Sequence, residues 1–411
     1  MIDCSFLQGR PVAVMGLGKS GMATARALIA GRAEVRAWDD DPAKRLEAEK
    51  SGIAVVDLNK CDWSDLSTLV LSPGIPHTHP APHPVAAKAR AAGAEIVGDI
   101  ELLARAERAA SYIGVTGTNG KSTTTALIGH VLGAAGREVR VGGNLGAPVL
   151  EFHPLKSGGA FVLEMSSYQI ELTVSLTFDV AVLLNITPDH LDRHGGMDGY
   201  VAAKKRIFAR QAKPNAAVIG VDDDHCRRIH ADLMQAGKQR VFPVSSEIAV
   251  KGGVYATDGV LIDDTDGAAV PALDLREIPT LPGRHNWQNA AAAYAAARAA
   301  GVAAPAIARG MRTYPGLKHR QELVAALGGI RFVNDSKATN PDAAAKALAS
   351  YRAIYWIAGG KPKEGGLDPV LPHLGNVRRA FLIGEAGERF ARELKGRVAL
   401  ERCGELKKAL V

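Results

Sequence analysis

A glycine-rich segment of seven residues constrains this chain more than any other feature of its sequence. Residues 117–123 read Gly-Thr-Asn-Gly-Lys-Ser-Thr and lie between an apolar, strand-like run over 112–115 and a helical pattern over 123–135. Glycines let backbone amides curl around phosphate oxygens, and a following helix N-terminus adds favourable partial charge. The order of strand, loop and helix therefore predicts an α/β fold built around a phosphate-binding turn.

The side chains of this segment suit ATP together with a magnesium ion. Lys121 can reach the outer phosphates, and Ser122 or Thr123 can ligate Mg²⁺. The eight-residue phosphate-loop pattern would have glycine where Val115 stands, so the match is to the shorter form Gly-x-x-Gly-Lys-Ser. A turn with an incidental lysine is the plain alternative. The residues expected to contact ATP here are Gly117, Thr118, Asn119, Gly120, Lys121, Ser122 and Thr123.

Length and charge point to several domains and to small anionic substrates. At 411 residues the chain is too long for one core, and we expect three domains. The net charge of +7 comes from Lys and Arg scattered among 43 acidic residues without long basic runs, which disfavours nucleic acid as a partner. A positively biased cleft would attract phosphates and carboxylates equally well.

The sequence gives no sign of secretion or of membrane insertion. Residues 1–10 lack a secretory pattern, and no apolar run approaches the length of a membrane span. The four cysteines lie far apart with no Cys-x-x-Cys pair, so neither a disulfide framework nor a zinc site is expected. A cytoplasmic location fits these features best.

A second glycine-rich loop opens the chain. A strand-like run over 12–15 leads into Gly-Leu-Gly-Lys-Ser-Gly at 16–21, and Asp39 follows a second run over 35–38. This is the Gly-x-Gly-x-x-Gly fingerprint, with an acidic residue at about the distance expected for a dinucleotide site. Taken alone, the fingerprint suggests an NAD-dependent dehydrogenase. The broader interpretation is that the loop holds a diphosphate while Asp39 meets a sugar or a base.

Strand-like runs alternate with helical patterns throughout, which predicts α/β layers in every domain. We place the domains at 1–100, 101–316 and 317–411, with the last boundary near the turn residues Tyr-Pro-Gly. The first and third are expected to be Rossmann-like, with a small open sheet in the third, and the second to be P-loop ATPase-like. Further expected strands are 161–163 and 180–184 in the second domain and 330–333, 353–358 and 381–383 in the third.

Polar residues follow two buried strands of the second domain. Glu164 ends the run 161–163, and a carboxylate there must be paired or must bind a metal, because leaving it bare is expensive. His190 stands just beyond the run 180–184. A hard Mg²⁺ prefers oxygen, so Glu164 is the better ligand, and a purely structural role for His190 stays open.

Lys204 differs from the other cations of its predicted helix. It shares a helical stripe with Tyr200 and Ile207, which favours an inward side chain. Burial would depress its pKa and free the amine for chemistry. A lysine that snorkels to the surface is an equal alternative on this pattern.

Three further groups of residues have both a functional and a structural interpretation. His285, Asn286 and Asn289 form a polar edge at a helix start, where they contact a nucleotide base or cap the helix. The run Asn-Asp-Ser-Lys-Ala-Thr-Asn-Pro over 334–341, with Arg320 upstream, suits phosphate and an acidic substrate, or a helix cap with proline in the first turn. The histidines of the proline-rich stretch 76–84 are interpreted as part of a loop rather than as metal ligands.

Taken in order and spacing, these motifs resemble the Mur ligases over residues 11 to about 400. The motifs are Gly-Thr-Asn-Gly-Lys-Ser, Glu164-Met-Ser-Ser, Asp-His190-Leu-Asp, Lys204 after Ala-Ala, His285-Asn286 and Asp335-Ser-Lys-Ala-Thr-Asn. With Ser-Pro-Gly-Ile at 72–75 and Ile-Val-Gly-Asp-Ile-Glu at 96–101, the last motif favours the branch that joins D-glutamate to UDP-N-acetylmuramoyl-L-alanine. The resemblance implies an ADP-forming amide ligase of peptidoglycan synthesis that works through an acyl phosphate, with Lys121 and Mg²⁺ offsetting the developing negative charge.

The resemblance also implies roles for individual residues. Lys204 would react with CO₂ to give a carbamate that helps His190 and Glu164 hold a second Mg²⁺. His190 is in addition a candidate base for the incoming amine. The implied metal ligands are Ser122, Thr123, Glu164, His190 and Lys204; the UDP-substrate residues are Leu17, Lys19, Ser20, Asp39, Gly74, Asn144 and Ser166; the further ATP residues are His285, Asn286, Asn289, Arg320 and Asp335; and the D-glutamate residues are Lys337, Thr339 and Lys363. The partners implied are these small molecules alone, and the protein is expected to be a monomer.

One departure from the family pattern concerns the C-terminus. Family members continue into a further strand and helix that grip the glutamate, whereas this chain stops at Val411 within a predicted helix that starts near Glu405. We therefore expect an incomplete third domain with weak affinity for D-glutamate. The alternatives kept open are a nucleotide-binding protein without full turnover and, as a minor one, the dehydrogenase.

Overall fold

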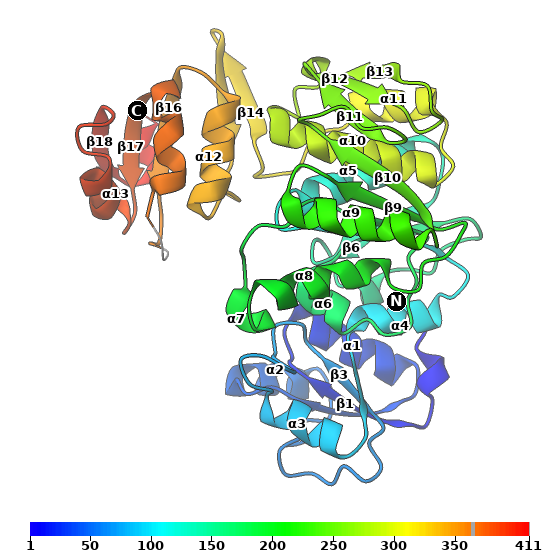
Figure 1. Ribbon diagram of the computed structural model, residues 1–411. Coiled ribbons are helices and arrows are strands. Elements are labelled where there is room, and N and C mark those ends of the chain that lie inside the picture. The colour runs from blue at the N-terminus through cyan, green and yellow to red at the C-terminus, as the bar shows by residue number, and fades with distance from the viewer. Residues whose placement is uncertain (363–365, 411) are drawn as a thin grey trace. The chain divides into compact units, whose positions relative to one another are not determined.

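The computed structural model describes residues 1–362 and 366–410, which form two compact units. The first unit comprises Met1–Leu273 and Gln288–Thr313, and the second comprises Asp274–Trp287 and Tyr314–Val411. Both units alternate strands with helices along most of their length (Figure 1). The expected α/β class is confirmed.

A four-stranded parallel sheet of order β2-β1-β3-β4 begins the first unit. Strand β3 is buried along its whole length, as expected for a parallel strand that is covered on both faces. The strands are β1 (Pro11–Met15), β2 (Glu34–Trp38), β3 (Thr68–Leu71) and β4 (Glu95–Val97). The helices are α1 (Lys19–Ala30), α2 (Pro42–Lys50), α3 (Pro84–Ala91) and α4 (Asp99–Ala106), after the short 3₁₀ helix η1 (Ser5–Leu7).

Local sequence determines where two of these helices begin. Asp41 caps α2 and His83 caps α3, each through a side chain that accepts a backbone N–H. Proline follows both caps, at a position where its fixed φ suits the first helical turn and its missing N–H has no partner to lose.

A nine-stranded sheet of order β13-β12-β11-β10-β9-β8-β5-β7-β6 is the largest element of the first unit. Pairing is parallel from β6 through to β11, and antiparallel between β11 and β12. The strands are β5 (Ser111–Thr116), β6 (Val139–Gly143), β7 (Ala160–Glu164), β8 (Val180–Leu183), β9 (Ala216–Gly220), β10 (Arg240–Ser245), β11 (Val254–Thr257), β12 (Val260–Asp263) and β13 (Val270–Asp274).

Helices and short turns connect the strands of this large sheet. They are α5 (Lys121–Ala134), α6 (Ser167–Glu171), α7 (Leu191–His194), α8 (Met197–Lys205), α9 (Asp224–Ala236), α10 (Arg284–Ala299) and α11 (Ala304–Arg312), with η2 (Val149–Glu151), η3 (Arg206–Phe208) and η4 (Leu275–Glu277). One apolar core cluster contains residues of both sheets, among them Val12, Val97 and Phe161. Because β5, β7 and β8 are parallel neighbours, the segments that follow them emerge at one edge of the sheet.

The second unit contains two separate small sheets. A three-stranded parallel sheet has the order β16-β17-β18, and β14 pairs with β15 in an antiparallel hairpin. The elements are β14 (Glu322–Leu327), β15 (Ile330–Asn334), α12 (Pro341–Ser350), β16 (Ile354–Gly359), η5 (Asp368–Asn376), β17 (Val377–Ile383), α13 (Gly387–Glu393), β18 (Leu400–Gly404) and α14 (Leu406–Ala409).

The hairpin corrects one expectation about the third segment. The run 330–333 was predicted to join a single open sheet, but it pairs with β14, an element that the sequence analysis did not identify. The intervening residues Gly328 and Gly329 both have positive φ, which allows the tight reversal of the chain.

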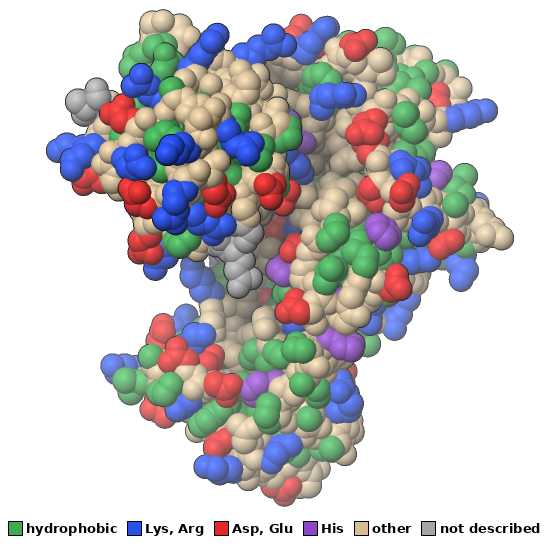
Figure 2. Space-filling view, turned by 60° about the vertical axis from the view of Figure 1, so that its left-hand side comes forward, with side chains coloured by type: hydrophobic (Ala, Val, Ile, Leu, Met, Phe, Trp, Pro, Cys, Tyr) green, Lys and Arg blue, Asp and Glu red, His purple; other side chains and the backbone are tan. Residues whose placement is uncertain are grey.

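Charged side chains of both signs share the surface (Figure 2). Lys and Arg side chains are interspersed with Asp and Glu over the face shown in Figure 2. Among the described residues, no helix is both long and apolar enough to cross a membrane.

Candidate functional site

The glycine-rich segment 117–123 forms the turn from β5 into α5, as predicted. Gly117 and Gly120 have φ values of 148° and 86°, which side chains other than glycine rarely allow. A Cβ at position 120 would lie 2.1 Å from Asn289 Oδ1, so this asparagine of α10 is packed directly on the loop. Glycine at 120 is thus required both by backbone conformation and by the close approach of Asn289.

Two lysines meet at one carbonyl of this loop. Lys121 Nζ donates to Gly117 O at 3.0 Å and to Thr118 O at 2.9 Å, while Lys204 Nζ donates to Gly117 O at 2.9 Å. These lysines lie far apart in the sequence, on α5 and α8, and the fold brings their amines to the same oxygen. An anionic phosphate group near them would find two donors already gathered.

Of the two interpretations left open for Lys204, the structure supports the inward one. The residue is only 2% exposed, and its amine lies 4.7 Å from the centre of the Tyr200 ring. Burial first, and then the charge of Lys121, lowers the pKa of Lys204 to about 7. An amine with that pKa is in large part neutral near neutral pH, and only the neutral amine is a nucleophile.

Glu164 ends β7 beside the loop. It pairs with Val115 of β5 and with Gly143 of β6, and it is 2% exposed. Its Oε1 accepts a hydrogen bond from Asn144 Nδ2 at 2.7 Å, whereas Oε2 is buried and makes no hydrogen bond within the described chain. A buried carboxylate oxygen without a donor is the arrangement that a hard cation would satisfy, so Glu164 fits a magnesium ion.

His190 lies in the segment after β8 and is more open. Its backbone is left-handed, with φ of 50°, and its side chain is 53% exposed. The ring lies 5.2 Å from that of Tyr168, centre to centre, and Nε2 is 3.5 Å from Asp189 Oδ2. Within the residues that the structure describes, no group of three or more His, Cys, Asp or Glu has the geometry of a metal site.

An amide relay that was not predicted from the sequence supports the loop. Asn185 Oδ1 accepts from the Asn119 N–H at 2.9 Å, and Asn185 Nδ2 donates to Asn119 O and to Gln288 Oε1, both at 3.2 Å. Gln288 Nε2 in turn donates to Asp222 Oδ2 at 2.8 Å. The position of Asn185 after a buried strand was the signal in the sequence that could have indicated this relay, because a buried side-chain amide needs partners for its oxygen and for its NH₂ group.

The first glycine-rich loop is braced by its acidic residue. Asp39 Oδ2 accepts from the Leu17 N–H at 2.6 Å, and its other oxygen accepts from the Asp41 N–H at 2.9 Å. Asp39 therefore orders the loop, in addition to any contact with a sugar or base. Lys19 and Gly74 of the same neighbourhood are exposed.

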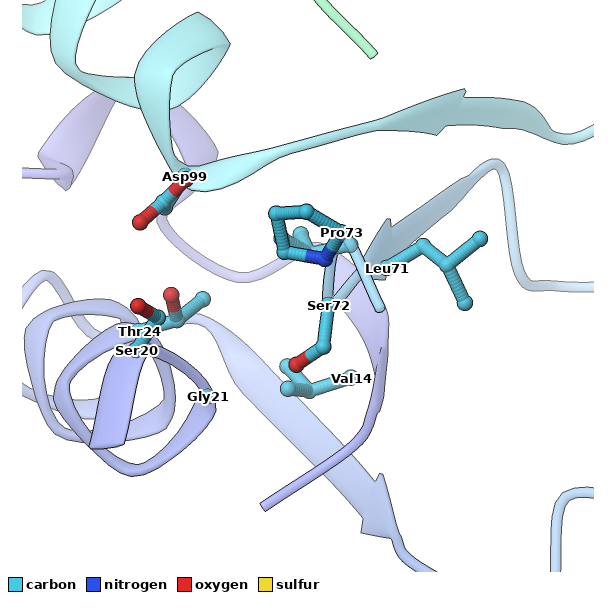
Figure 3. A pocket seen from close by; sticks show the side chains of 9 residues that line it. Val14, Ser20, Gly21, Thr24, Leu71, Ser72, Pro73 and Asp99 are labelled. Carbon is cyan, nitrogen blue, oxygen red and sulfur yellow. The ribbon is translucent and has the colours of Figure 1, made fainter. Parts of the chain in front are cut away.

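A small recess lies beside this loop (Figure 3). Ser20 and Thr24 of α1 face Asp99 of α4 across it, and Ser72 closes one side. Burial raises the pKa of Asp99, although bonds from Ile100 N–H and Ser20 act in the opposite direction. Ser20, expected at the UDP substrate, is thus held by a carboxyl group that the sequence analysis did not assign.

Two other residues expected at the UDP substrate have structural partners. Asn144 donates a hydrogen bond to Glu164, so a residue expected to contact the UDP substrate directly contacts a residue expected to bind the metal. Ser166 caps α6 in a reciprocal capping box with Gln169. Ser122 and Thr123 lie in the first turn of α5 and are partly exposed.

The remaining expected residues belong to the second unit. Burial, followed by the charge of Lys346, lowers the pKa of His285 to about 4, which keeps this ring neutral. Asn286 Nδ2 donates to Pro282 O at 2.8 Å, and Asp335 Oδ1 accepts from the Gln321 N–H at 3.0 Å. Arg320, Lys337 and Thr339 are exposed, and Lys363 lies outside the described residues. Asn340 caps α12 ahead of Pro341. The end of the run 334–341 therefore forms the helix cap that the sequence offered as the alternative to substrate binding.

Known proteins resemble this chain along its whole length, and two family models match parts of it. The Mur ligase middle domain matches residues 115–297, and the Mur ligase glutamate ligase domain matches residues 319–410. The UDP-N-acetylmuramoylalanine--D-glutamate ligase of Caulobacter sp. (strain K31) is 52% identical over 416 residues, covering 100% of this chain and 89% of that protein. The protein of the same name from Rhodospirillum rubrum is 54% identical, covering 98% of this chain and 85% of its own length.

The fold likeness extends to solved structures. The UDP-N-acetylmuramate-alanine ligase of Thermotoga maritima superposes with a TM-score of 0.61 at 18% identity, covering 97% of this chain and 91% of that one. At that level of identity, the superposition supports a shared three-domain α/β fold.

Proposed function

The chain belongs to the Mur ligase family, and we propose that it joins D-glutamate to UDP-N-acetylmuramoyl-L-alanine with conversion of ATP to ADP and phosphate. The observation that carries the proposal is the meeting of Lys121 and Lys204 at the Gly117 carbonyl. The relatives compared above lend no support to a dehydrogenase or to a nucleotide-binding protein without turnover.

The first step transfers a phosphoryl group. A carboxylate oxygen of the UDP-linked substrate attacks the γ-phosphorus of ATP, and the bond from that phosphorus to the oxygen of ADP breaks. Negative charge spreads over the phosphoryl oxygens as this happens. Lys121 and the N-terminal end of α5 would stabilise that charge from fixed positions.

The second step forms the amide bond. The amine nitrogen of D-glutamate attacks the acyl phosphate carbon, and inorganic phosphate leaves with the electron pair of the broken C–O bond. The amine loses a proton. His190, whose ring is half exposed beside Asp189, is a candidate acceptor as the alternative to its assignment as a metal ligand.

Magnesium fits the residues at this edge of the sheet. We assign Ser122, Thr123 and Glu164 as ligands, with His190 and a modified Lys204 at a second ion. The bound metal would neutralise phosphate charge and orient the reacting oxygens. The orphaned Glu164 Oε2 supports this assignment.

Lys204 is proposed to carry a carbamate. Its neutral amine attacks CO₂, a C–N bond forms and the nitrogen releases a proton, so a neutral amine becomes an anionic carbamate that would serve as a metal ligand. The lowered pKa of the amine favours this reaction, because protonated amines do not react.

The substrate assignments complete the proposal. Domains 1–100, 101–316 and 317–411 would bind the UDP substrate, ATP and D-glutamate in that order, in a monomer in the cytoplasm. The UDP substrate is assigned to Leu17, Lys19, Ser20, Asp39, Gly74, Asn144 and Ser166, further ATP contacts to His285, Asn286, Asn289, Arg320 and Asp335, and D-glutamate to Lys337, Thr339 and Lys363.

Phosphate release tests the proposal directly. Purified protein should release phosphate from ATP only when UDP-N-acetylmuramoyl-L-alanine and D-glutamate are both present, and L-glutamate should not replace the D isomer. Release that ignores D-glutamate, or ATP binding without any release, would rule out the ligase assignment.

A further inference from the structure

Four polar side chains form a chain of contacts between the two sheets of the first unit. Ser167 Oγ lies 2.9 Å from His194 Nε2, His194 Nδ1 lies 3.1 Å from Glu171 Oε1, and Glu171 Oε2 lies 3.5 Å from His77 Nε2. We call Ser167, Glu171, His194 and His77 the Glu171 cluster. Ser167 and Glu171 belong to α6, His194 to α7, and His77 to the loop that follows β3.

The Glu171 cluster is buried and charged. The side chains of His194 and Glu171 are 1% and 14% exposed. Burial alone would raise the pKa of Glu171, but its contacts with His194 and His77 outweigh that effect and lower the pKa to about 2. The carboxylate is therefore ionised throughout the physiological range. Its Oε1 is hydrogen-bonded to His194, whereas Oε2 and His77 Nε2 lie at ion-pair distance without a hydrogen bond, so charge attraction is what links Glu171 to His77.

The order serine, histidine, carboxylate matches the connectivity of a hydrolytic triad. Ser167 is only 3% exposed, however, and its hydroxyl faces His194, so an acyl substrate has no approach to it. A nucleophile must reach its substrate, and this serine cannot. The Glu171 cluster is accordingly a connection within the fold and not a second active site.

A side chain near the end of α7 donates to backbone carbonyl groups of the same loop. Arg193 donates to Ile75 O at 3.0 Å and to His79 O at 3.3 Å. A Cβ at Gly195 would lie 3.0 Å from His79 Cε1, so the loop packs closely on the helix end. The loop after β3 is thus held by α6 and α7 at several points along its length.

The other end of this loop contacts the first glycine-rich loop. Ser72 Oγ donates to Gly16 O at 3.0 Å, and the Ser72 N–H donates to Met15 O at 2.9 Å. Helices α6 and α7 themselves follow Glu164 and His190 in the chain. The loop over residues 72–79 therefore connects the expected UDP-binding loop to the elements that carry the expected metal ligands.

We propose that Glu171 is a positioning residue, which holds residues 72–79 in the conformation that binds the UDP-linked substrate. The inference rests on the proposed function, and it adds a residue that touches no substrate. Loss of the Glu171 charge would free His77 and loosen the loop that contains Gly74, while the ATP loop, which has its own support from Asn185, would be unaffected.

Steady-state kinetics of Glu171→Gln test this inference. The amide keeps the shape of the side chain and removes the charge. We expect the KM for UDP-N-acetylmuramoyl-L-alanine to rise about tenfold or more, with the KM for ATP within about twofold of the wild-type value. A loss of general stability would not separate the two KM values in this way.

Glu101→Gln is the matched control. Glu101 is also a buried carboxylate of the first unit, bonded to Arg105 and Ser175, but it does not contact residues 72–79. Its substitution should lower the thermal midpoint while both KM values stay within about twofold of wild type. A double-mutant cycle of Glu171→Gln with His77→Leu should be non-additive, because the two changes remove the same contact.

The outcomes separate this inference from the proposed function. If the wild type turns over and folded Glu171→Gln has an unchanged KM for the UDP substrate, or has both KM values raised in parallel, the positioning role is overturned and the ligase assignment stands. If Glu171→Gln does not fold, His77→Leu alone decides by the same criterion. If the wild type neither binds nor uses the UDP substrate, the proposed function fails and the positioning role falls with it.

Discussion

Replacing Lys204 with methionine tests whether the buried amine is held in its neutral form. Lys204 is 2% exposed, and its pKa is lowered from 10.5 to about 7, first by burial and then by the charge of Lys121. Methionine keeps most of the apolar stem and removes the ionisable group. The pH dependence of the difference in unfolding free energy between the two proteins therefore reports the protonation of one side chain.

The sign of the effect follows from proton binding. Between about pH 7 and 10.5 the folded protein holds a neutral Lys204 whereas the unfolded chain holds a protonated lysine, so the unfolded state binds more protons. The stability of the wild type relative to Lys204→Met must then rise with pH, by at most about 1.4 kcal/mol per pH unit. Between about pH 6 and about pH 9, the expected gain is about 2 to 3 kcal/mol.

Urea unfolding, followed by circular dichroism in buffers purged of CO₂, measures this difference. Lys205→Met is the matched control for the loss of a lysine, because Lys205 belongs to the same helix but pairs with Asp232 at the surface. If the difference for Lys204→Met were constant over this range, the amine would be protonated in the folded state like an exposed lysine, and the physical reason to expect carbamate formation would be gone.

Three further predictions concern the nucleotide loop, its support and the metal. Gly120→Ala should weaken ATP binding about tenfold or more, because φ is 86° and the new Cβ would lie 2.1 Å from Asn289 Oδ1; calorimetric titration that finds wild-type affinity would contradict the loop geometry. Asn185→Ala should raise the KM for ATP about tenfold, since both backbone groups of Asn119 lose a partner, and a selective rise in the KM for the UDP substrate would oppose this account. Glu164→Gln should raise the Mg²⁺ concentration for half-maximal turnover about tenfold or more, and an unchanged requirement would remove Glu164 from the ligand set.

The phosphate loop could be predicted in detail because its shape depends on neighbouring residues in the sequence. Glycine stands at both positions where the backbone has positive φ, and a strand and a helix flank it with nearly the expected bounds. The helical stripe that Lys204 shares with Tyr200 and Ile207, which are both buried, favoured an inward lysine but did not exclude one that reaches the surface.

The pairing of β14 with β15 could not be predicted from the sequence. An apolar run such as 330–333 indicates a strand, but the run contains no information about which strand will pair with it. The amide relay through Asn185, Gln288 and Asp222 was missed for the same reason, since its members are far apart in the chain.

Motif order and local backbone chemistry were sufficient to recognise the family and the nucleotide loop, whereas they left an inward and a surface position of Lys204 equally open. The convergence of Lys121 and Lys204 on Gly117 O, the orphaned oxygen of Glu164 and the contacts of Glu171 with two histidines became visible in the folded chain alone. Backbone propensity and periodicity act over a few residues, whereas desolvation and charge depend on every group that packing brings within a few ångströms.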